Sequence, residues 1–355
     1  MKTGTVGIGI ISFAHGHVSS YCSEWVKRND VRLVAAWDDN VERGQAAAAQ
    51  FGTKFETDLD ALVSNPEIDL IAVASETAKH ADHVVAAVRA GKDVLLQKPM
   101  ALSLADCNRI IEAVDRAGVW FAMAYQMRYD PSNQKIRKLV QDGTLGQISL
   151  LRRRHCIPAL FNEAFITGAS NWHIRPEMNM GMFMDDASHA ADFIYWVLGR
   201  PKSCIAEIVA AYIDPAVTPD DLGVAIYRYD DNKLAVLTNS SITWAGENTT
   251  EVYGDRGVLI QNHDDGPSTG LKPPGAIALK LFLQEQADKG WQDLGLEIPD
   301  GHGRRIAAVA SGVLADYRAG DIRCSSREGR VSIEMVLAAY KSAAEGRRVM
   351  IDEDA

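Results

Sequence analysis

Asp185 and His189 are four residues apart, a spacing that places two side chains on one face of a helix, directed at the same space. An imidazole titrates near neutral pH, so His189 is a candidate proton acceptor, and the carboxylate of Asp185 can orient a hydroxyl group or the ring. Lys98 follows a short apolar run, and an ammonium group at the end of a buried strand can orient a hydroxyl. Together they suggest proton transfer on a hydroxyl-bearing substrate, although singly Lys98 is typical of a surface lysine and His189 of a structural histidine.

Five short apolar runs alternate with helical patterns in the first third of the chain. Such runs are typical of parallel strands, because helices cover both faces of a parallel sheet. Strand and helix in alternation imply right-handed crossovers and a doubly wound α/β sheet, the Rossmann arrangement. The predicted strands are residues 6–11, 31–36, 68–74, 94–96 and 119–124, and the helices 41–51, 80–90 and 103–117.

The pattern changes after Tyr125, where strand candidates follow one another between turn residues. This succession predicts a large, mostly antiparallel sheet with helices around it. A chain of 355 residues is also long for one domain, so we expect two, residues 1–124 and 125–355. The predicted strands here are residues 147–156, 203–213, 222–229, 234–241, 249–253 and 257–261, and the helices 131–141, 187–198, 304–317 and 327–345.

Parallel sheets bind ligands at the carboxyl ends of their strands, so the turn after the first strand matters. That turn reads Ser-Phe-Ala-His-Gly-His at residues 12–17, and the glycines of a dinucleotide fingerprint are largely replaced. Gly7 and Gly9 fall inside the strand and do not count toward the fingerprint. The small residues Ser12 and Ala14 still permit close approach, and a helix amino end can hold a phosphate.

Asp38 ends the second strand, where a carboxylate accepts both hydroxyls of the ribose in NAD and repels the extra phosphate of NADP. Asp39 adds to that repulsion, and no arginine is adjacent to Asp38 in the sequence. NAD is therefore the expected cofactor. The alternative is a turn aspartate that caps the following helix.

Composition excludes several other classes of protein. The formal net charge is −10 and no long basic stretch occurs, which argues against a nucleic-acid or membrane partner. The three arginines 152–154 would alternate faces at a solvated strand edge. No apolar stretch nears the ~20 residues of a membrane span, and the start has neither a signal nor a transit pattern. The five cysteines are far apart in the sequence, and the histidines show no metal-ligand spacing. We therefore expect a cytoplasmic protein without disulfides or a metal site.

Five segments, in order, resemble motifs of the Gfo/Idh/MocA oxidoreductase family, named for glucose-fructose oxidoreductase and inositol dehydrogenase. The resemblance covers nearly the whole chain. The segments are SETAKH at 75–80 (family TPxxxH), AGKDVLLQKP at 90–99 (AGKHVLxEKP), RYDP at 128–131 (RFxP), GMFMDDASHAAD at 181–192 (GGxLxDxGxHxxD) and AAYKSAAEGRRV at 338–349 (final helix and strand).

The resemblance implies an NAD-dependent oxidoreductase that oxidises a secondary hydroxyl of a sugar or cyclitol, and a homodimer or homotetramer formed through the second sheet. It departs at Gln97 (family Glu), Glu76 (family Pro) and His173 (family Arg). It implies catalytic residues Lys98, Asp185 and His189, cofactor-binding residues Ser12, Phe13, Ala14, His15, Asp38, Ser75, Glu76, His80, Gln97, Lys98, Gln126 and Trp172, and substrate-binding residues Lys98, Arg128, His173, Asp185 and His189.

Alternatives remain at this stage. Whether Lys98 or His189 takes the proton is open. Some relatives oxidise a ring carbon transiently and cleave a glycoside by elimination, with no net redox change. The replaced glycine loop also allows a sensor or partner-binding protein that has lost catalysis, although the retained Lys98, Asp185 and His189 argue against it.

Overall fold

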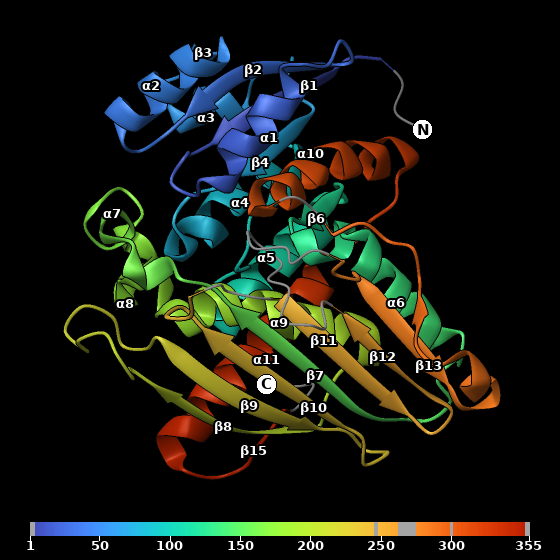
Figure 1. The fold of residues 1–355 in the computed structure, drawn as a ribbon. Coiled ribbons are helices and arrows are strands. Elements are labelled where there is room, and N and C mark those ends of the chain that lie inside the picture. The colour runs from blue at the N-terminus through green and yellow to red at the C-terminus, as the bar shows by residue number, and fades with distance from the viewer. Residues whose placement is uncertain (1–3, 245–247, 262–274, 299–300, 352–355) are drawn as a thin grey trace.

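Two β-sheets with helices packed on them make up the structure (Figure 1). The computed structural model describes residues 4–244, 248–261, 275–298 and 301–351. No helix in these ranges is both long and apolar enough to cross a membrane.

The N-terminal sheet confirms the predicted Rossmann arrangement. Its six strands pair in parallel in the order β3-β2-β1-β4-β5-β6, so the strand order reverses between β1 and β4. Ligands bind at such a switch point. The strands are β1 Val6–Ile11, β2 Val31–Trp37, β3 Lys54–Phe55, β4 Leu70–Val73, β5 Asp93–Leu96 and β6 Phe121–Met123, and the helices are α1 His17–Trp25, α2 Val41–Phe51, α3 Leu59–Val63, η1 Thr77–Lys79, α4 His80–Arg89 and α5 Leu104–Ala117.

The two glycines of β1 have a packing role in the structure. A Cβ on Gly7 would lie 1.9 Å from the carbonyl oxygen of Glu67, and a Cβ on Gly9 would lie 2.8 Å from the side chain of Ile68. Both glycines therefore let the segment before β4 approach β1 closely.

The second sheet has nine strands in the order β14-β13-β12-β11-β7-β10-β9-β8-β15. All its pairs are antiparallel except β7 with β10, which confirms a mostly antiparallel sheet. The strands are β7 Ile148–Cys156, β8 Ser203–Val209, β9 Leu222–Arg228, β10 Leu234–Ser240, β11 Asn248–Gly254, β12 Gly257–Gln261, β13 Leu279–Leu283, β14 Gln292–Asp293 and β15 Val349–Met350.

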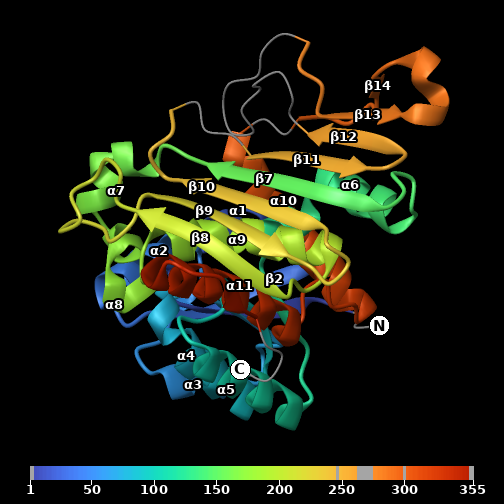
Figure 2. The ribbon, with the colours of Figure 1, turned by 90° about the horizontal axis from the view of Figure 1, so that it is seen from below.

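Helices cover one face of this sheet, and no helix among the described residues covers the other (Figure 2). The central helix is α9, Met182–Leu198, which packs on β7 and β10 and begins earlier than the predicted residue 187. The remaining elements are η2 Gln126–Tyr129, α6 Pro131–Gln141, η3 Ala159–Phe161, α7 Glu163–Thr167, η4 Asn171–Ile174, α8 Pro176–Asn179, η5 Gln284–Lys289, α10 Gly301–Ala319 and α11 Ser326–Glu345.

The arginine run does alternate faces, but the prediction of a solvated edge is wrong. β7 lies in the middle of the sheet, between β11 and β10. Arg153 is 1% exposed and donates to Thr250 and Gln261, and its guanidinium lies over the ring of Phe193. The two oxygen acceptors and the ring of Phe193 on α9 compensate the guanidinium for the water it loses, so a cation can lie on the inner face of the sheet.

Helix α10 returns to the first sheet and lies against α1 (Figure 1). Nε1 of Trp25 donates to the carbonyl oxygen of Ala310 at 3.1 Å, and Val313 and Tyr317 belong to the hydrophobic core behind β1. The last third of the chain therefore helps to stabilise the Rossmann layer.

Candidate active site

Lys98 and Asp185 form a buried ion pair. Lys98 follows β5, and Asp185 lies in the first turn of α9. Lys98 Nζ lies 3.0 Å from Asp185 Oδ1, and the residues are 2% and 4% exposed. The structure thus brings two of the three predicted catalytic residues into direct contact. Their catalytic role stays a prediction.

His173 contacts the same carboxylate. Its Nδ1, carried by η4, lies 3.1 Å from Oδ1 of Asp185. Burial alone would raise the pKa of Asp185, but His173 and Lys98 hold that pKa well below the ordinary value of a carboxyl group. Asp185 is therefore ionised at neutral pH and can accept a hydrogen bond from a substrate hydroxyl.

His189 lies one turn further along α9 and stacks on His155, with ring centroids 5.4 Å apart. Burial first, and then the charge of Lys98, lower the pKa of His189 well below the ordinary value. Its Nδ1 is buried and has no hydrogen-bond partner among the described residues. A neutral ring with an open nitrogen can accept a proton.

The turn after β1 also reaches this centre. The ring of His15 lies edge-on to the rings of Trp172 and His173, with centroids 5.9 and 5.2 Å away. Nε1 of Trp172 donates to the carbonyl oxygen of Ala14 at 3.2 Å. The structure therefore places the predicted residues His15, Trp172 and His173 side by side, where the two layers meet.

The backbone amides of this turn are already bonded inside the protein. The Ser12 amide donates to Trp37, the Phe13 amide to Asp38, and the Ala14 amide to the hydroxyl oxygen of Ser12. Ser12 has a φ of 68°, a left-handed value that is uncommon for a serine. The predicted close approach of a phosphate to the Ser12 and Ala14 amides therefore lacks free donors.

Asp38 has a partner that its sequence neighbours did not suggest. Arg43, from α2, donates to both of its carboxylate oxygens, at 2.7 and 2.9 Å. Asp38 also accepts from the amides of Phe13 and Asn40 and from the hydroxyl of Ser12. No arginine is adjacent to Asp38 in the sequence, but in the structure Arg43, in the first turn of α2, reaches back to its carboxylate at the end of β2.

Hydrogen bonds and ion pairs connect the turn after β4 with the turn after β5 and support Lys98. The ring of His80 lies between the carbonyl oxygens of Ser75 and Pro99, and burial lowers its pKa to about 4. Gln97 accepts from the amide of Lys98 and donates to Tyr21, so its side chain supports Lys98 from behind. Glu76 accepts from Lys79 at 2.9 Å and belongs to the same ion-pair group as Arg43.

Gln126 and Arg128 differ in their surroundings although both lie in η2. Both polar atoms of the Gln126 side chain are buried and have no partner among the described residues. Arg128 is fully buried, and its guanidinium bonds to Asp192, Glu328 and the carbonyl oxygen of Arg323. These partners all belong to the protein itself, and the structure does not bring Arg128 to Lys98.

Two buried polar residues of this region were not predicted as site residues. Asp186 accepts from Ser241 at 3.1 Å, and Nε2 of His155 lies 3.9 Å from it. Burial, and then the nearby Asp185, raise the pKa of Asp186 to about 7. The sequence could have indicated them only through the second aspartate of the 181–192 motif and through the position of His155 near the end of a strand.

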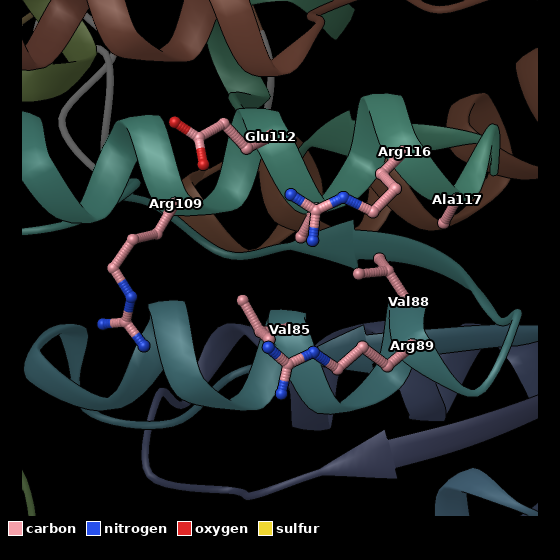
Figure 3. Close-up of a pocket in the computed structure, with 8 residues that line it drawn as sticks. Val85, Val88, Arg89, Arg109, Glu112, Arg116 and Ala117 are labelled. Carbon is pink, nitrogen blue, oxygen red and sulfur yellow. The ribbon is translucent and has the colours of Figure 1, made fainter.

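A groove of about 340 Å³ between α4 and α5 is a separate feature (Figure 3). Arg89 from α4 and Arg116 from α5 extend along it, and Arg109 lies at one end. No predicted site residue lines it.

A nicotinamide dinucleotide fits the donors and acceptors that the protein leaves open at the carboxyl edge of the first sheet. Nε2 of His15 and the side-chain amide of Gln126 are buried without partners in the described residues. The first turn of α1 carries no acidic residue, so its positive end can face a phosphate. Lys98 would contact the nicotinamide ribose side, and Asp38 and Arg43 would flank the adenosine ribose.

Residues 1–125 match the family model "Oxidoreductase family, NAD-binding Rossmann fold", and residues 133–260 match "GFO/IDH/MocA C-terminal domain". The chain is 25% identical to myo-inositol 2-dehydrogenase of Thermotoga maritima over 99% of both chains. It is 24% identical to scyllo-inositol 2-dehydrogenase (NADP(+)) of Bacillus subtilis over 99% of this chain and 96% of that one. Levoglucosan dehydrogenase in complex with NADH has the same fold, with a TM-score of 0.82, 19% identity and coverage of 98% and 99%.

Proposed function

The chain belongs to the Gfo/Idh/MocA oxidoreductase family, and on that premise we propose that it is an NAD(H)-dependent dehydrogenase of a sugar, sugar derivative or cyclitol. The observation that carries the proposal is the buried contact of Lys98 with Asp185, with His189 one turn away on the same helix. Relatives named as inositol dehydrogenases support a polyhydroxy substrate.

Oxidation of a secondary alcohol removes a hydride from carbon and a proton from oxygen. When bound, the nicotinamide ring accepts the hydride. Lys98 donates a hydrogen bond to the substrate oxygen and stabilises its developing negative charge, and Asp185 accepts from a substrate hydroxyl and fixes Lys98. His189 takes the proton, because burial keeps its ring neutral.

The same site supports a preference for NAD over NADP. Three carboxylates, Asp38, Asp39 and Glu76, surround the two cations Arg43 and Lys79 at the end of β2. An added ribose phosphate would meet net negative charge there. Arg43 occupies both carboxylate oxygens of Asp38, so it competes with the ribose hydroxyls for them. Its guanidinium is also the group that would bind the extra phosphate of NADP.

A redox-neutral glycoside cleavage uses the same first step, so it is the second candidate. Asp186 favours it, since a carboxyl group whose pKa is raised to about 7 can act as an acid toward a leaving oxygen.

The test is incubation of the protein with NAD and panels of cyclitols, free sugars and glycosides, followed by NADH absorbance and product analysis. Free NADH in proportion to product supports the dehydrogenase. Cleaved glycoside without NADH would replace it with the redox-neutral reaction. NADH binding without turnover on any panel member would favour a sensor.

The free face of the second sheet supports the expected homo-oligomer. Ile205, Val224 and Ile226 are each exposed by more than a third on adjacent strands β8 and β9. A second copy that covers this face would bury them. Light scattering measures the molar mass of the native protein and of Ile226→Glu in solution. We expect a smaller assembly in the variant, and an unchanged mass would place the interface elsewhere.

A further inference from the structure

The turn between β1 and α1 does not offer the backbone cradle that a dinucleotide diphosphate ordinarily uses. The amides of residues 12–15 all donate inside the protein, the last of them to the carbonyl oxygen of Ala74. A cofactor that relies on this turn therefore needs other donors. The amide of Gly16, at the amino end of α1, makes no hydrogen bond to a described residue.

His15 supplies such a donor, and its tautomer follows from the backbone. The amide of His17 donates to Nδ1 of His15 at 3.3 Å, so Nδ1 is the acceptor of the ring. Burial, with His17 and Lys98 nearby, lowers the pKa of His15 well below the ordinary value, so the ring is neutral. A neutral imidazole with an accepting Nδ1 carries its proton on Nε2.

This Nε2–H group is a buried donor without a partner. His15 is 3% exposed, and its Nε2 bonds to none of the described residues. An unsatisfied buried donor costs free energy, which a ligand acceptor recovers. His15 precedes the amino end of α1, whose first turn has no acidic side chain, and its ring lies edge-on to Trp172 and His173.

Space for a ligand exists beside the next residue. A Cβ built on Gly16 meets no protein atom within 4 Å, and Gly16 is exposed. A phosphate oxygen can therefore approach the Gly16 amide along the axis of α1.

We propose that Nε2–H of His15 and the amide of Gly16 bind the cofactor diphosphate, as a side-chain clamp that takes the place of the missing glycine-rich cradle. This rests on the proposed function, since it presumes that the protein binds a dinucleotide. The histidine at position 15 is then a binding residue for the cofactor and not for the sugar.

The test uses ADP-ribose, which carries the diphosphate, and adenosine, which does not. Both displace NADH in a fluorescence titration of the native protein and three variants. His15→Phe keeps the ring contacts and removes the donor. Gly16→Ala adds a methyl group where the protein has room but the phosphate would lie. Lys27→Ala is the control, since Lys27 is a 65% exposed cation just beyond the other end of α1.

We expect His15→Phe and Gly16→Ala each to weaken ADP-ribose on the order of tenfold while adenosine affinity stays native, and Lys27→Ala to change neither. Equal losses for adenosine and ADP-ribose would show a merely structural effect and overturn the clamp. Native ADP-ribose affinity in both variants would overturn it as well, while leaving the dehydrogenase intact. No binding of NADH or ADP-ribose to the native protein would overturn both.

Discussion

Nζ of Lys98 lies 3.0 Å from Oδ1 of Asp185, although 87 residues separate the two in the chain. One side chain follows a strand of the Rossmann sheet, and the other starts the helix that supports the second sheet. The contact therefore joins the cofactor layer to the expected substrate layer at one buried point. The proposed catalysis and the contact between the two layers therefore involve the same pair.

The first prediction concerns His189 as the base. We expect His189→Gln to lower kcat by about 10²–10⁴-fold while the circular dichroism spectrum stays native. Because burial and Lys98 lower the pKa of His189, the neutral ring persists below pH ~6.5, the ordinary histidine value. Native kcat/KM should therefore fall only at more acid pH. A native rate in the variant would assign the proton to Lys98.

The second prediction concerns cofactor choice at Asp38 and Arg43. Asp38→Asn removes a charge and loosens Arg43, so we expect the ratio of NADPH to NADH affinity to rise on the order of tenfold. Arg43→Ala should lower that ratio. Fluorescence titration with each nucleotide measures both, and Arg32→Ala, an exposed cation of β2, is the control. An unchanged ratio of NADPH to NADH affinity in both variants would mean that Asp38 only stabilises the turn and does not select the cofactor.

The third prediction separates two roles of Arg128. Its guanidinium is paired with the buried Asp192, so Arg128→Met leaves a carboxylate without its cation. We expect the free energy of unfolding in urea to fall by about 3–5 kcal/mol. Replacing Asp192 by Leu in the same chain should restore part of that loss. Native stability with a raised KM for substrate would instead support the substrate role that the family resemblance implies.

The fourth prediction uses pH to test Asp186. Its pKa is raised to about 7, so between pH ~4 and 7 the folded protein keeps a proton that the unfolded chain loses. Stability contributed by this group therefore falls as pH rises through that window, and the loss is complete above it. Asp186→Asn should raise the Tm by a few degrees at pH 8 and much less at pH 5. An equal shift at both values would contradict the raised pKa.

The Rossmann half was predictable because β1, β4 and β6 are short, fully buried apolar runs. β1 has the predicted bounds, and β2 differs from its prediction by one residue. The start of α9 was missed, since the methionines before residue 187 are ordinary core residues in any element. A strand as short as β14 has too few residues to give a pattern, and only its pairing with β13 defines it.

The sequence motifs pointed to Lys98, Asp185 and His189, and the structure brings Lys98 and Asp185 into contact. The catalytic role of all three stays a prediction. What could not be predicted are contacts set by packing between distant segments. Arg43 reaches Asp38 only because α2 folds back over β2, and the tautomer of His15 depends on a neighbouring amide. Spacing in the sequence does not contain that information.

The central claim is that the Lys98 and Asp185 pair performs the oxidation, and one comparison tests it most directly. NADH binding and NADH formation from NAD and the substrate found in the panels are measured on the native protein and on Lys98→Met. We expect the variant to bind NADH up to about tenfold more weakly, because Lys98 would also contact the nicotinamide ribose, and to form NADH at least about 10³-fold more slowly at saturating NAD. Native turnover in Lys98→Met would contradict the account.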